Sequence, residues 1–477
     1  MIALPQSAHA IIDTLKNAGF EAYAVGGSVR DTIMGKKTKG WDFTTNAIPQ
    51  EILDLFPDSF YDNQFGTVGI KMRKTPVTHD TLETVQANPA SLTDDQAIED
   101  IYEVTTYRSE SGYTDRRHPD TITWGKTIEA DLARRDFTIN AIAWDGNTII
   151  DPYDGQKDIR NKIIRTVGNP GDRFTEDALR MMRAVRLASE LGFTINDRTL
   201  EGIQTNARHL ATISWERIRD ELLRILAAPF AADAILVLKS TGLLAIVMPE
   251  LISAFTTEQK SPKRHHIYDV GTHSVMALKF CPSADPVVRL ATLIHDIGKP
   301  QTYRKDDTGV ITFYNHEVAG TKIARAIAAR LRLSKKHTDL VLTLVRWHQF
   351  SVDERQTDAA LRRFIRRVGR DNLDAMLALR IGDRLGGGAQ ETSWRLELYK
   401  KRLVDVQKQP FTVHDLQING HDVMKELNVK PGPVIGKTLD RIFKEVEEGT
   451  LANNREALTA RLHELGSTPN AFAVNLG

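Results

Sequence analysis

The sequence predicts an α+β protein in which a head with a mixed sheet is followed by an all-α remainder. Segments with a two-residue apolar period occur up to about residue 165, whereas helical periodicity dominates from Asp177 onward. The chain has 477 residues, and at about 150 residues per folding unit this length predicts about three units rather than one core.

Strands are expected in the head wherever apolar and polar residues alternate. The segments concerned are residues 22–25, 41–44, 67–72, 101–107 and 139–144. Residues 74–100 are polar, contain two prolines and show no apolar period, so we expect a surface insertion there. Later stretches such as EDALRMMRAVR and SWERIRDEL have apolar residues three and four apart, as amphipathic helices do.

Four units follow from these signals and from breaks near residues 259–266, at the glycines 386–388 and at 408–410. The expected boundaries are 1–165 for the head, 166–260 for a helical neck and body, 261–388 for a histidine-rich unit and 389–477 for a helical tail.

Composition excludes several classes of protein. Lysine plus arginine number 63 against 62 acidic residues, so any nucleic-acid site must be a local patch. The single cysteine, Cys281, cannot form an internal disulfide. No run of about 18 apolar residues and no secretory signal is evident, so we expect a cytoplasmic protein without a membrane partner.

A phosphate-binding turn is indicated near the start of the head. An apolar strand ending at Val25 leads into Gly26, Gly27 and Ser28 and then a helix, so backbone N–H groups at the helix start can face a triphosphate. Arg30 could add a charged fork. The simpler interpretation is a tight connection with a solvated arginine.

A carboxylate follows in KGWDFTTNA, where strand alternation places positions 40, 42 and 44 on one face. Nucleotidyl transfer uses two Mg²⁺ ions, which paired aspartates hold through hard oxygen ligands. Here Asp42 is present, and Glu103 in IYEVTTY could face it from a neighbouring strand.

With these residues the chain resembles the class II CCA-adding enzyme and bacterial poly(A) polymerase family. The resemblance rests on GGSVRD, WDFTTNA, EVTTYR, RRDFTINA, EDALRMMRAVR and SWERIRDEL, in this order, and covers roughly residues 20 to 225. It implies template-independent addition of C-C-A to tRNA from CTP and ATP, with Mg²⁺ in the head. A poly(A) polymerase or a partial C- or A-adding enzyme is the first alternative.

One position departs from the family pattern Asp-x-Asp, because its first aspartate falls on Gly40. Glycine has no side chain to bind a metal, so the site would depend on Asp42 and Glu103. We therefore hypothesise that nucleotide addition is strongly impaired in this chain. A tRNA-binding phosphohydrolase with an inactive head is the second alternative.

Nucleotide contacts are expected from two further segments. The resemblance implies that Arg135 contacts the nucleotide and Asp136 the sugar, and that the region of Asp115 and Arg117 is a mobile loop. On the following helix, Asp177 and Arg180 lie three positions apart and could pair with the amino donor and ring acceptor that cytosine and adenine share. Arg183 and Arg186 lie on the following turns and would meet the triphosphate or support that pair.

Seven of the 14 histidines lie between residues 265 and 348, which is typical of a metal site rather than core filling. The order of histidines and aspartates around LATLIHDIGKP resembles the HD phosphohydrolase superfamily. The ligand positions would be taken by His273, His295, Asp296 and Asp383, with His316 and His348 matching members that bind two metals. Lys299 is expected to contact phosphate.

This second resemblance implies one or two divalent ions and a phosphatase or 2′,3′-cyclic phosphodiesterase activity that would trim damaged tRNA ends. Positive charge is concentrated in two runs, and such runs are either tRNA contacts or solvated helix faces. The tail is expected to grip tRNA, and no stable protein partner is implied. The arginines and lysines of the two runs are Arg325, Arg330, Arg332, Lys335, Lys336, Arg362, Arg363, Arg366, Arg367 and Arg370.

Overall fold

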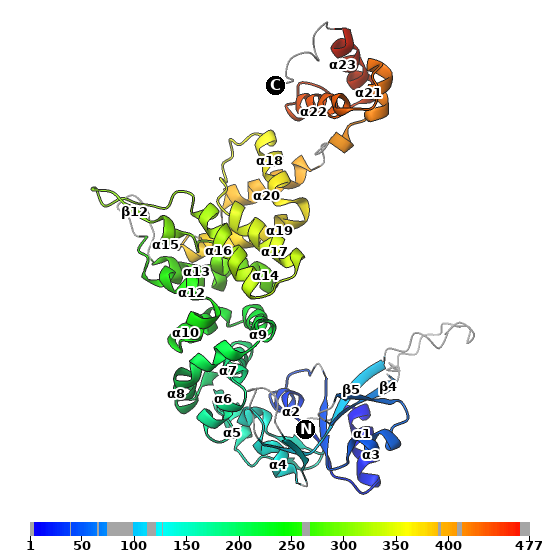
Figure 1. Cartoon of the computed structure of the whole chain (residues 1–477), viewed down its shortest axis with the longest axis vertical. Coiled ribbons are helices and arrows are strands. Elements are labelled where there is room, and N and C mark those ends of the chain that lie inside the picture. Colours follow the sequence, from blue (N-terminus) through cyan, green and yellow to red (C-terminus); the bar gives the residue numbers. More distant parts are fainter. Residues whose placement is uncertain are drawn as a thin grey trace, which may run out of the picture. The chain divides into compact units, whose positions relative to one another are not determined.

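The computed structural model describes residues 4–38, 40–63, 66–73, 99–111, 121–125, 127–259, 268–389, 393–407 and 413–467. The chain divides into two compact units, coloured along the sequence in Figure 1. The first comprises Met1–Ser253 with Ala329–Leu333, and the second comprises Ala254–Ala328 with Ser334–Gly477.

A seven-stranded sheet in the order β3-β4-β5-β2-β1-β8-β9 forms the head. All its pairs are antiparallel except β2 with β5, so the sheet is mixed, as predicted. A separate two-stranded sheet joins β6 and β7. The strands are β1 (Ala22–Val25), β2 (Asp42–Thr45), β3 (Ser59–Asn63), β4 (Thr67–Arg73), β5 (Glu99–Thr106), β6 (Arg108–Ser111), β7 (Thr121–Trp124), β8 (Ala143–Trp144) and β9 (Ile149–Ile150).

Short helices complete the head. The amphipathic helix α1 buries Ala8, Ile11, Ile12 and Leu15, whose spacing places them on one face. The remaining head helices are α2 (Gly27–Ile33), α3 (Pro49–Leu55), α4 (Ile128–Ala133) and α5 (Gly155–Asn161), with α1 at Gln6–Asn17.

One predicted strand is largely wrong. Within residues 139–144 only Ala143–Trp144 pair as β8, and the preceding residues form the 3₁₀ helix η2 (Thr138–Asn140). Thr138 Oγ1 donates a hydrogen bond to Asp158 Oδ2 at 2.7 Å, which stabilises this 3₁₀ turn. The alternation of apolar and polar residues in the sequence does not predict such a contact. The predicted insertion lies outside the described residues except at its last two positions, and so do Asp115 and Arg117.

Helices dominate the rest of the first unit, together with the short parallel pair β10 (Ile163–Ile164) and β11 (Thr194–Ile195). The predicted helix around EDALRMMRAVR is interrupted, because Asp177 has φ −141° and ψ 105° and separates α6 from α7. The helices are α6 (Pro170–Glu176), α7 (Leu179–Leu191), α8 (Asp197–Asn206), η3 (Ala207–Thr212), α9 (Trp215–Ala227), α10 (Ala231–Ser240), α11 (Leu243–Val247), α12 (Pro249–Ile252) and η4 (Ser253–Thr256).

The second unit is mostly helical, as predicted, with one small hairpin of β12 (Arg304–Lys305) and β13 (Ile311–Thr312). Its helices bury apolar faces such as Leu290, Ala291 and Ile294 of α14. They are α13 (Val270–Phe280), α14 (Pro286–Ile294), α15 (Lys299–Thr302), α16 (His316–Arg330), α17 (Lys335–Trp347), α18 (Asp358–Val368), η5 (Arg370–Asn372), α19 (Leu373–Gly386), α20 (Trp394–Val406), η6 (Val413–Asp415), α21 (Gly420–Leu427), α22 (Pro433–Glu447) and α23 (Arg455–Ser467).

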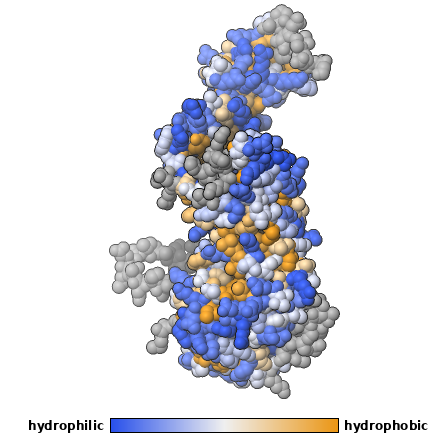
Figure 2. Space-filling model, turned by 90° about the vertical axis from the view of Figure 1, so that its left-hand side faces the viewer, coloured by the Kyte–Doolittle hydropathy of each residue, from blue (hydrophilic) through white to orange (hydrophobic). Residues whose placement is uncertain are grey.

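The surface gives no sign of a bilayer-spanning segment. Among the described residues, no helix combines the length and the apolar character needed to cross a membrane. On the face drawn in Figure 2, apolar residues gather in patches among hydrophilic ones.

Candidate active site and metal centre

Two carboxylates meet on one face of the head sheet. Asp42 opens β2, and its neighbour on the parallel strand β5 is Glu103. Residues in register on adjacent strands point to the same side of a sheet, and both residues are exposed. On the other side of β2, Asp42 pairs in register with Val25, the residue before the glycine turn. The structure therefore brings together the turn and both predicted carboxylates.

The glycine turn lies against the same site. Gly26 has φ +77°, which glycine adopts without strain. A Cβ there would lie 3.4 Å from Arg135 Nη1 and 3.7 Å from Asp42 Oδ2. Although Asp42 is exposed, the surrounding protein removes enough water to raise the pKa of its carboxyl, an effect that the Arg135 guanidinium partly offsets.

Gly40 lies two residues before Asp42, is exposed and is not part of a strand. Among the described residues, no atom lies within 4 Å of the position that a Cβ would take, and the backbone is not left-handed. Nothing steric in the described structure therefore requires glycine at this position.

Arg30 and Ser28 are occupied by structural contacts rather than directed at a ligand. Arg30 Nη1 donates to Asn140 Oδ1 at 2.7 Å, and its Nη2 donates to Asp31 Oδ1 at 2.7 Å. The Ser28 hydroxyl donates to the carbonyl of Val25 at 3.0 Å. These two side chains therefore fix the turn to η2 and β1, and a phosphate contact by Arg30 stays a prediction.

Asp131 is a site residue that the sequence interpretation missed. Its carboxylate is fully buried and accepts hydrogen bonds from Arg134 Nη2 at 2.5 Å and from Arg135 Nη2 at 3.0 Å. Burial alone would raise the pKa of Asp131, but Arg135 and Arg134 outweigh this and lower it. The spacings of three and four residues on α4 were the signal available in the sequence.

Asp136 is also buried and faces the helical neck. Its Oδ1 accepts from Phe137 N at 2.9 Å and from Asn140 Nδ2 at 3.3 Å. Its Oδ2 lies 3.3 Å from Arg183 Nη1. Burial alone would raise the pKa of Asp136, but Arg183 and Arg180 hold it below its usual value. Asp136 therefore remains an anion beside two of the predicted nucleotide-binding arginines.

Asp177 and Arg180 are oriented by different partners. Asp177 Oδ2 lies 2.8 Å from Arg217 Nη2, and Asp177 Oδ1 accepts from Leu179 N at 3.0 Å. Arg180 Nη1 donates to Glu176 Oε2 at 2.6 Å, and Nη2 donates to the carbonyl of Arg134 at 3.3 Å. The two residues are not on one helix as predicted, since Asp177 follows α6 and Arg180 lies in α7.

Arg186, which was predicted to bind the nucleotide, is paired with two glutamates inside the fold. Its Nε donates to Glu221 at 2.6 Å and its Nη1 donates to Glu190 at 2.8 Å, and the residue is buried. Arg183, in contrast, has a side chain that is 40% exposed. Of the two, Arg183 is the one that a nucleotide can reach.

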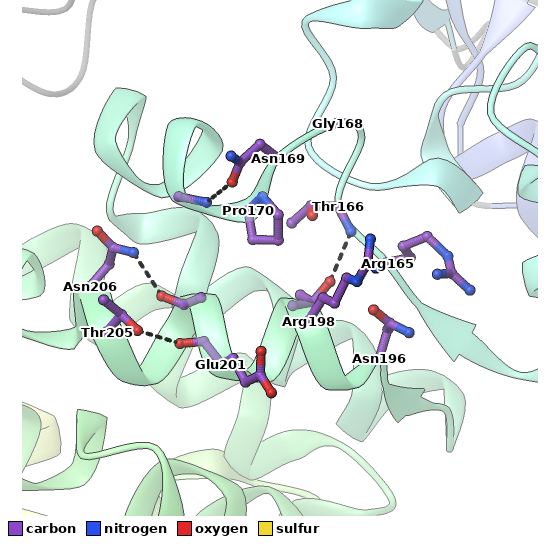
Figure 3. Close-up of a pocket in the computed structure, with 13 residues that line it drawn as sticks. Arg165, Thr166, Gly168, Asn169, Pro170, Asn196, Arg198, Glu201, Thr205 and Asn206 are labelled. Atoms are coloured by element: carbon purple, nitrogen blue, oxygen red, sulfur yellow. Dashed lines mark hydrogen bonds between the residues drawn. The ribbon is translucent and has the colours of Figure 1, made fainter.

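A cavity of about 700 Å³ is lined by residues between Arg165 and Asn206 (Figure 3). Its wall includes Thr166, which pairs with Phe137 through an isolated bridge and donates its backbone N–H to Thr199 Oγ1 at 3.2 Å. The figure shows Arg165, Asn196 and Arg198 at one side and Asn169 with Pro170 at another. None of the predicted site residues lines this cavity.

In the second unit, all six residues predicted as metal ligands converge, and Asp296 is central. Its Oδ2 lies 3.2 Å from His295 Nε2 and 3.6 Å from His273 Nε2, while its Oδ1 lies 3.2 Å from His316 Nε2 and 3.5 Å from His348 Nε2. Asp383 Oδ1 completes the first group at 3.1 Å from His273 Nε2.

The imidazoles are oriented as metal ligands. Nδ1 of His295, His316 and His348 each lies 2.8 Å from a backbone carbonyl, which can only accept, so each Nδ1 carries the proton and each Nε2 presents a lone pair. The Nε2 atoms of His316 and His348 are 3.3 Å apart. A proton or a metal ion shared between these two nitrogens would hold them at this distance.

Charge at this cluster also fits a divalent ion. Burial alone would lower the pKa of His295, but Asp296 and Asp383 raise it to about 10. The buried carboxylates thus demand positive charge, which a divalent ion supplies in place of protons. Two overlapping triads, His273, His295, Asp296 and Asp296, His316, His348, each have ligand atoms within 4.8 Å of one another.

The cluster opens into a cavity of about 530 Å³ whose lining includes Lys299, Tyr314 and Arg380. Lys299 Nζ lies 2.6 Å from Asp296 Oδ2 and donates to Gln259 Oε1 at 2.9 Å, so the predicted phosphate contact is engaged with a ligand carboxylate here. Arg380 Nη1 donates to Asp383 Oδ2 at 2.8 Å. Gln259 and Arg380 were not identified from the sequence.

Several arginines of the predicted basic surface are paired with other groups of the protein. Arg362 donates to the Glu447 carbonyl, Arg366 lies 2.8 Å from Glu447 Oε1, and Arg330 pairs with Glu250 at 2.7 Å. Arg363 and Arg367 on α18 are exposed, and the described residues give neither an acidic partner.

Taken together, the turn, the strand carboxylates and the arginine-rich neck define a nucleotidyltransferase head followed by helical units. Family models agree with this class. The Poly A polymerase head domain matches residues 22–165, the model described as "Probable RNA and SrmB-binding site of polymerase A" matches 192–255, and tRNA nucleotidyltransferase domain 2 matches 307–462. An HD-type model is not among them.

The chain belongs to the family of CCA-adding enzymes. It is 32% identical to the CCA-adding enzyme of Geobacillus stearothermophilus over 467 residues, which is 97% of this chain and 98% of that one. It is 30% identical to that of Ligilactobacillus salivarius, covering 95% of each chain. Other alignments, such as that to Geobacillus kaustophilus at 44% identity, cover 50% of this chain and about half (54%) of the relative.

Solved structures agree with the fold. The Bacillus stearothermophilus CCA-adding enzyme in complex with CTP superposes with a TM-score of 0.67 at 30% identity, over 96% of each chain. A Thermotoga maritima CCA-adding enzyme complexed with tRNA has a TM-score of 0.59 at 17% identity over 97% of each chain, which supports the fold alone. The predicted class of fold and family are therefore confirmed.

Proposed function

We propose that this chain adds C-C-A to the 3′ end of tRNA, taking CTP and ATP as substrates and using no template. The observation that carries the proposal is the convergence of Asp42, Glu103, Gly26 and Arg135 on one face of the head sheet, within a chain that belongs to the CCA-adding family over nearly its full length. A membrane plays no part in this proposal, and location in the cytoplasm stays a prediction.

The residues of the neck would select and hold the nucleotide. Asp177 accepts hydrogen bonds only, so it matches an amino group, and Arg180 donates only, so it matches a ring nitrogen acceptor. Cytosine and adenine offer this pair of groups, whereas uracil and guanine place a carbonyl and a ring N–H there. Arg217 orients the Asp177 carboxylate, because its Nη2 donates to Asp177 Oδ2 at 2.8 Å. Arg135 and Arg183 supply positive charge for the triphosphate.

A divalent ion fits the head only in part. Asp42 and Glu103 supply hard oxygen ligands on one face, but Gly40 supplies none. When bound, Mg²⁺ would polarise the α-phosphate and lower the pKa of the attacking 3′ hydroxyl. Two carboxylates suit one weakly held ion better than two ions, so we propose that the head binds tRNA and nucleotide but turns over slowly.

The test uses tRNA that lacks its terminal C-C-A, Mg²⁺ and each labelled nucleotide separately and together. Addition of two C residues followed by one A supports the proposal. Long A tails would assign a poly(A) polymerase, and addition of C or A alone would assign a partial enzyme. Binding of CTP and tRNA without incorporation, even at high Mg²⁺ concentration, would assign a head that binds but does not transfer.

A second function is favoured by the convergence of the histidine Nε2 atoms on Asp296. We propose that the second unit hydrolyses phosphoesters with one or two divalent ions, held by His273, His295, Asp296 and Asp383 on one side and by Asp296, His316 and His348 on the other. When bound, the metal would supply an activated water and neutralise phosphate charge. Arg380 and Lys299 add fixed positive charge beside it.

In this reaction the oxygen of water forms a new P–O bond, the P–O bond to the leaving alcohol breaks, and that alcohol takes a proton. Release of phenol from phenyl phosphate by the full-length chain, with added Mn²⁺, Mg²⁺, Co²⁺ or Ni²⁺ in turn, measures it. The rate should be unchanged in Asp42→Asn and lost in Asp296→Asn. Equal rates in both variants would assign the hydrolysis to a contaminant.

A further inference from the structure

The rim of the metal cavity carries an exposed aromatic ring. Tyr314 is 77% exposed, more than any other large apolar or aromatic side chain among the described residues, and it lines the cavity of about 530 Å³ that contains Asp296, His316 and His348. A large ring in water beside a polar site is typical of a binding surface rather than of packing.

The backbone holds Tyr314 next to the ligands. Phe313 precedes it, is buried, and accepts from His316 Nδ1 at 2.8 Å through its carbonyl. Asn315 follows it with φ +61°, a left-handed conformation that is strained for a residue with a side chain. His316 then begins α16. One short segment therefore fixes a predicted metal ligand and projects a tyrosine outward.

The part of this segment around Phe313 is held rigidly by packing. The Phe313 ring packs at 5.9 Å between centroids against Tyr303, and Lys299 Nζ lies 5.4 Å from the centre of the Phe313 ring. Tyr314 itself projects from this anchored base. A ring presented on a fixed base loses little freedom when a flat ligand stacks on it.

The cavity is larger than a phosphate group requires. A volume of about 530 Å³ falls in the range of sites that enclose a whole small molecule. Positive groups lie at its base, where Lys299 and Arg380 flank the ligand carboxylates, and the aromatic ring lies at its rim. A nucleotide has this polarity, with an anionic phosphate at one end and a flat base at the other.

We propose that Tyr314 is a stacking platform for a nucleobase and that it makes the metal site select nucleoside monophosphate groups over phosphoesters without a base. This inference rests on the proposed phosphoester hydrolysis of the same site. The nucleotide is either free or the 3′-terminal residue of an RNA. One base–aromatic stack has an energy that corresponds to about a tenfold effect or more on affinity.

Photolabelling tests the platform without relying on turnover. The full-length chain is irradiated with 8-azidoadenosine 3′-monophosphate, and labelled peptides are mapped by mass spectrometry. Label on the peptide that contains Tyr314 is expected, with about a tenfold loss in Tyr314→Ala and retention in Tyr314→Phe. Tyr61→Ala, which removes a tyrosine that is 47% exposed on the head, is the matched control and should change nothing. Equal labelling of that peptide in Tyr314→Ala would overturn the proposal.

Kinetic measurements distinguish free nucleotide from an RNA end, and they distinguish failure of the Tyr314 platform from failure of the hydrolase. Tyr314→Ala should raise KM for adenosine 3′-monophosphate about tenfold and leave KM for glycerol 2-phosphate, which has no ring to stack, unchanged. Comparing the free nucleotide with an RNA that ends in a 3′-phosphate shows which source is preferred, and a preference for either supports the platform. An equal KM for nucleotide in Tyr314→Ala and the parent overturns it. Hydrolysis of neither substrate would defeat the hydrolase, while photolabelling would still decide the platform.

Discussion

The carboxylate of Asp177 lies 2.8 Å from the guanidinium of Arg217, across the interval between α6 and α9. The side chain proposed to read the base is therefore held by a residue 40 positions away. Because Asp177 Oδ1 also accepts from Leu179 N, its carboxylate has little freedom to turn. Base selection in this chain depends on an ion pair that spans the neck.

Removing Arg217 should relax nucleotide selection. In Arg217→Ala, Asp177 loses its charged partner, and we expect the ratio of the Kd for UTP to the Kd for CTP to fall about tenfold to hundredfold, because an unpaired carboxylate reorients. Equilibrium binding of both nucleotides measures this ratio. Arg219→Ala is the control, since Arg219 pairs with exposed Asp220 on the same helix. An unchanged ratio in Arg217→Ala would show that Asp177 needs no support.

Gly40→Asp should increase the rate of CCA addition by about a hundredfold or more, because a third carboxylate beside Asp42 and Glu103 permits two-metal binding. The described surroundings leave room for the side chain. Gly40→Asn, which has nearly the same size and no charge, is the matched control and should give a much smaller gain. Single-turnover incorporation of labelled CTP is the measurement, and equal rates in all three proteins would refute the hypothesis that Gly40 limits activity.

Asp131 should stabilise the head in a pH-dependent way. Its pKa is lowered in the folded state, so its contribution is present above the unfolded value of about 4 and is lost as the pH falls through the lower folded value. Asp131→Asn leaves Arg134 and Arg135 without their buried partner and should cost about 3 kcal/mol at pH 7. Urea unfolding followed by tryptophan fluorescence at pH 7 and below pH 3 checks this. A difference that persists at low pH would contradict it.

The number of metal ions bound per chain should depend on which of the two ligand groups around Asp296 is changed. His316→Ala should lose the ion held with His348, and His273→Ala the ion held with His295 and Asp383, whereas Asp296→Asn should weaken both. Elemental analysis of the purified variants gives the number of ions per chain. His337→Ala, which changes a histidine outside the cluster, is the control. Identical metal content in every variant would place the ion elsewhere.

Salt dependence tests the remaining basic surface. The described residues provide no acidic partner for Arg363 or Arg367, so we expect these two to contact tRNA phosphate. The double variant Arg363→Ala, Arg367→Ala should lower the slope of log affinity against log salt concentration by about 1 to 2. Filter binding of tRNA between low and moderate salt measures the slope. Arg402→Ala, whose arginine pairs with Asp358, should leave it unchanged.

Sequence reasoning predicted the fold where the signal was local. Four of the five predicted head strands form where the alternation that a half-buried strand requires is present. The histidines converge because His295, His316 and His348 lie at helix ends and His273 lies in the first turn of α13. Family membership was predicted from ordered motifs and is confirmed. The residue roles and the metal remain proposals.

The side-chain contacts that the sequence did not predict share a physical cause, which is long-range pairing. Nothing near Arg30 in the sequence indicates Asn140, which lies 110 residues away and accepts a hydrogen bond from its guanidinium. Helical spacing likewise gives no sign that Arg186 donates to Glu221 on another helix. The interruption at Asp177 follows from tertiary contacts that outweigh a helical pattern.

Three imidazoles of the metal centre share one local arrangement, since His295, His316 and His348 each bond through Nδ1 to the carbonyl of the residue three positions earlier. Tautomer and ring direction at these three residues are thus determined by a local contact within one turn. Grafting this four-residue turn into another helical protein would therefore give a histidine whose Nε2 is already oriented to bind a metal. Only the position of the turn would then have to be designed.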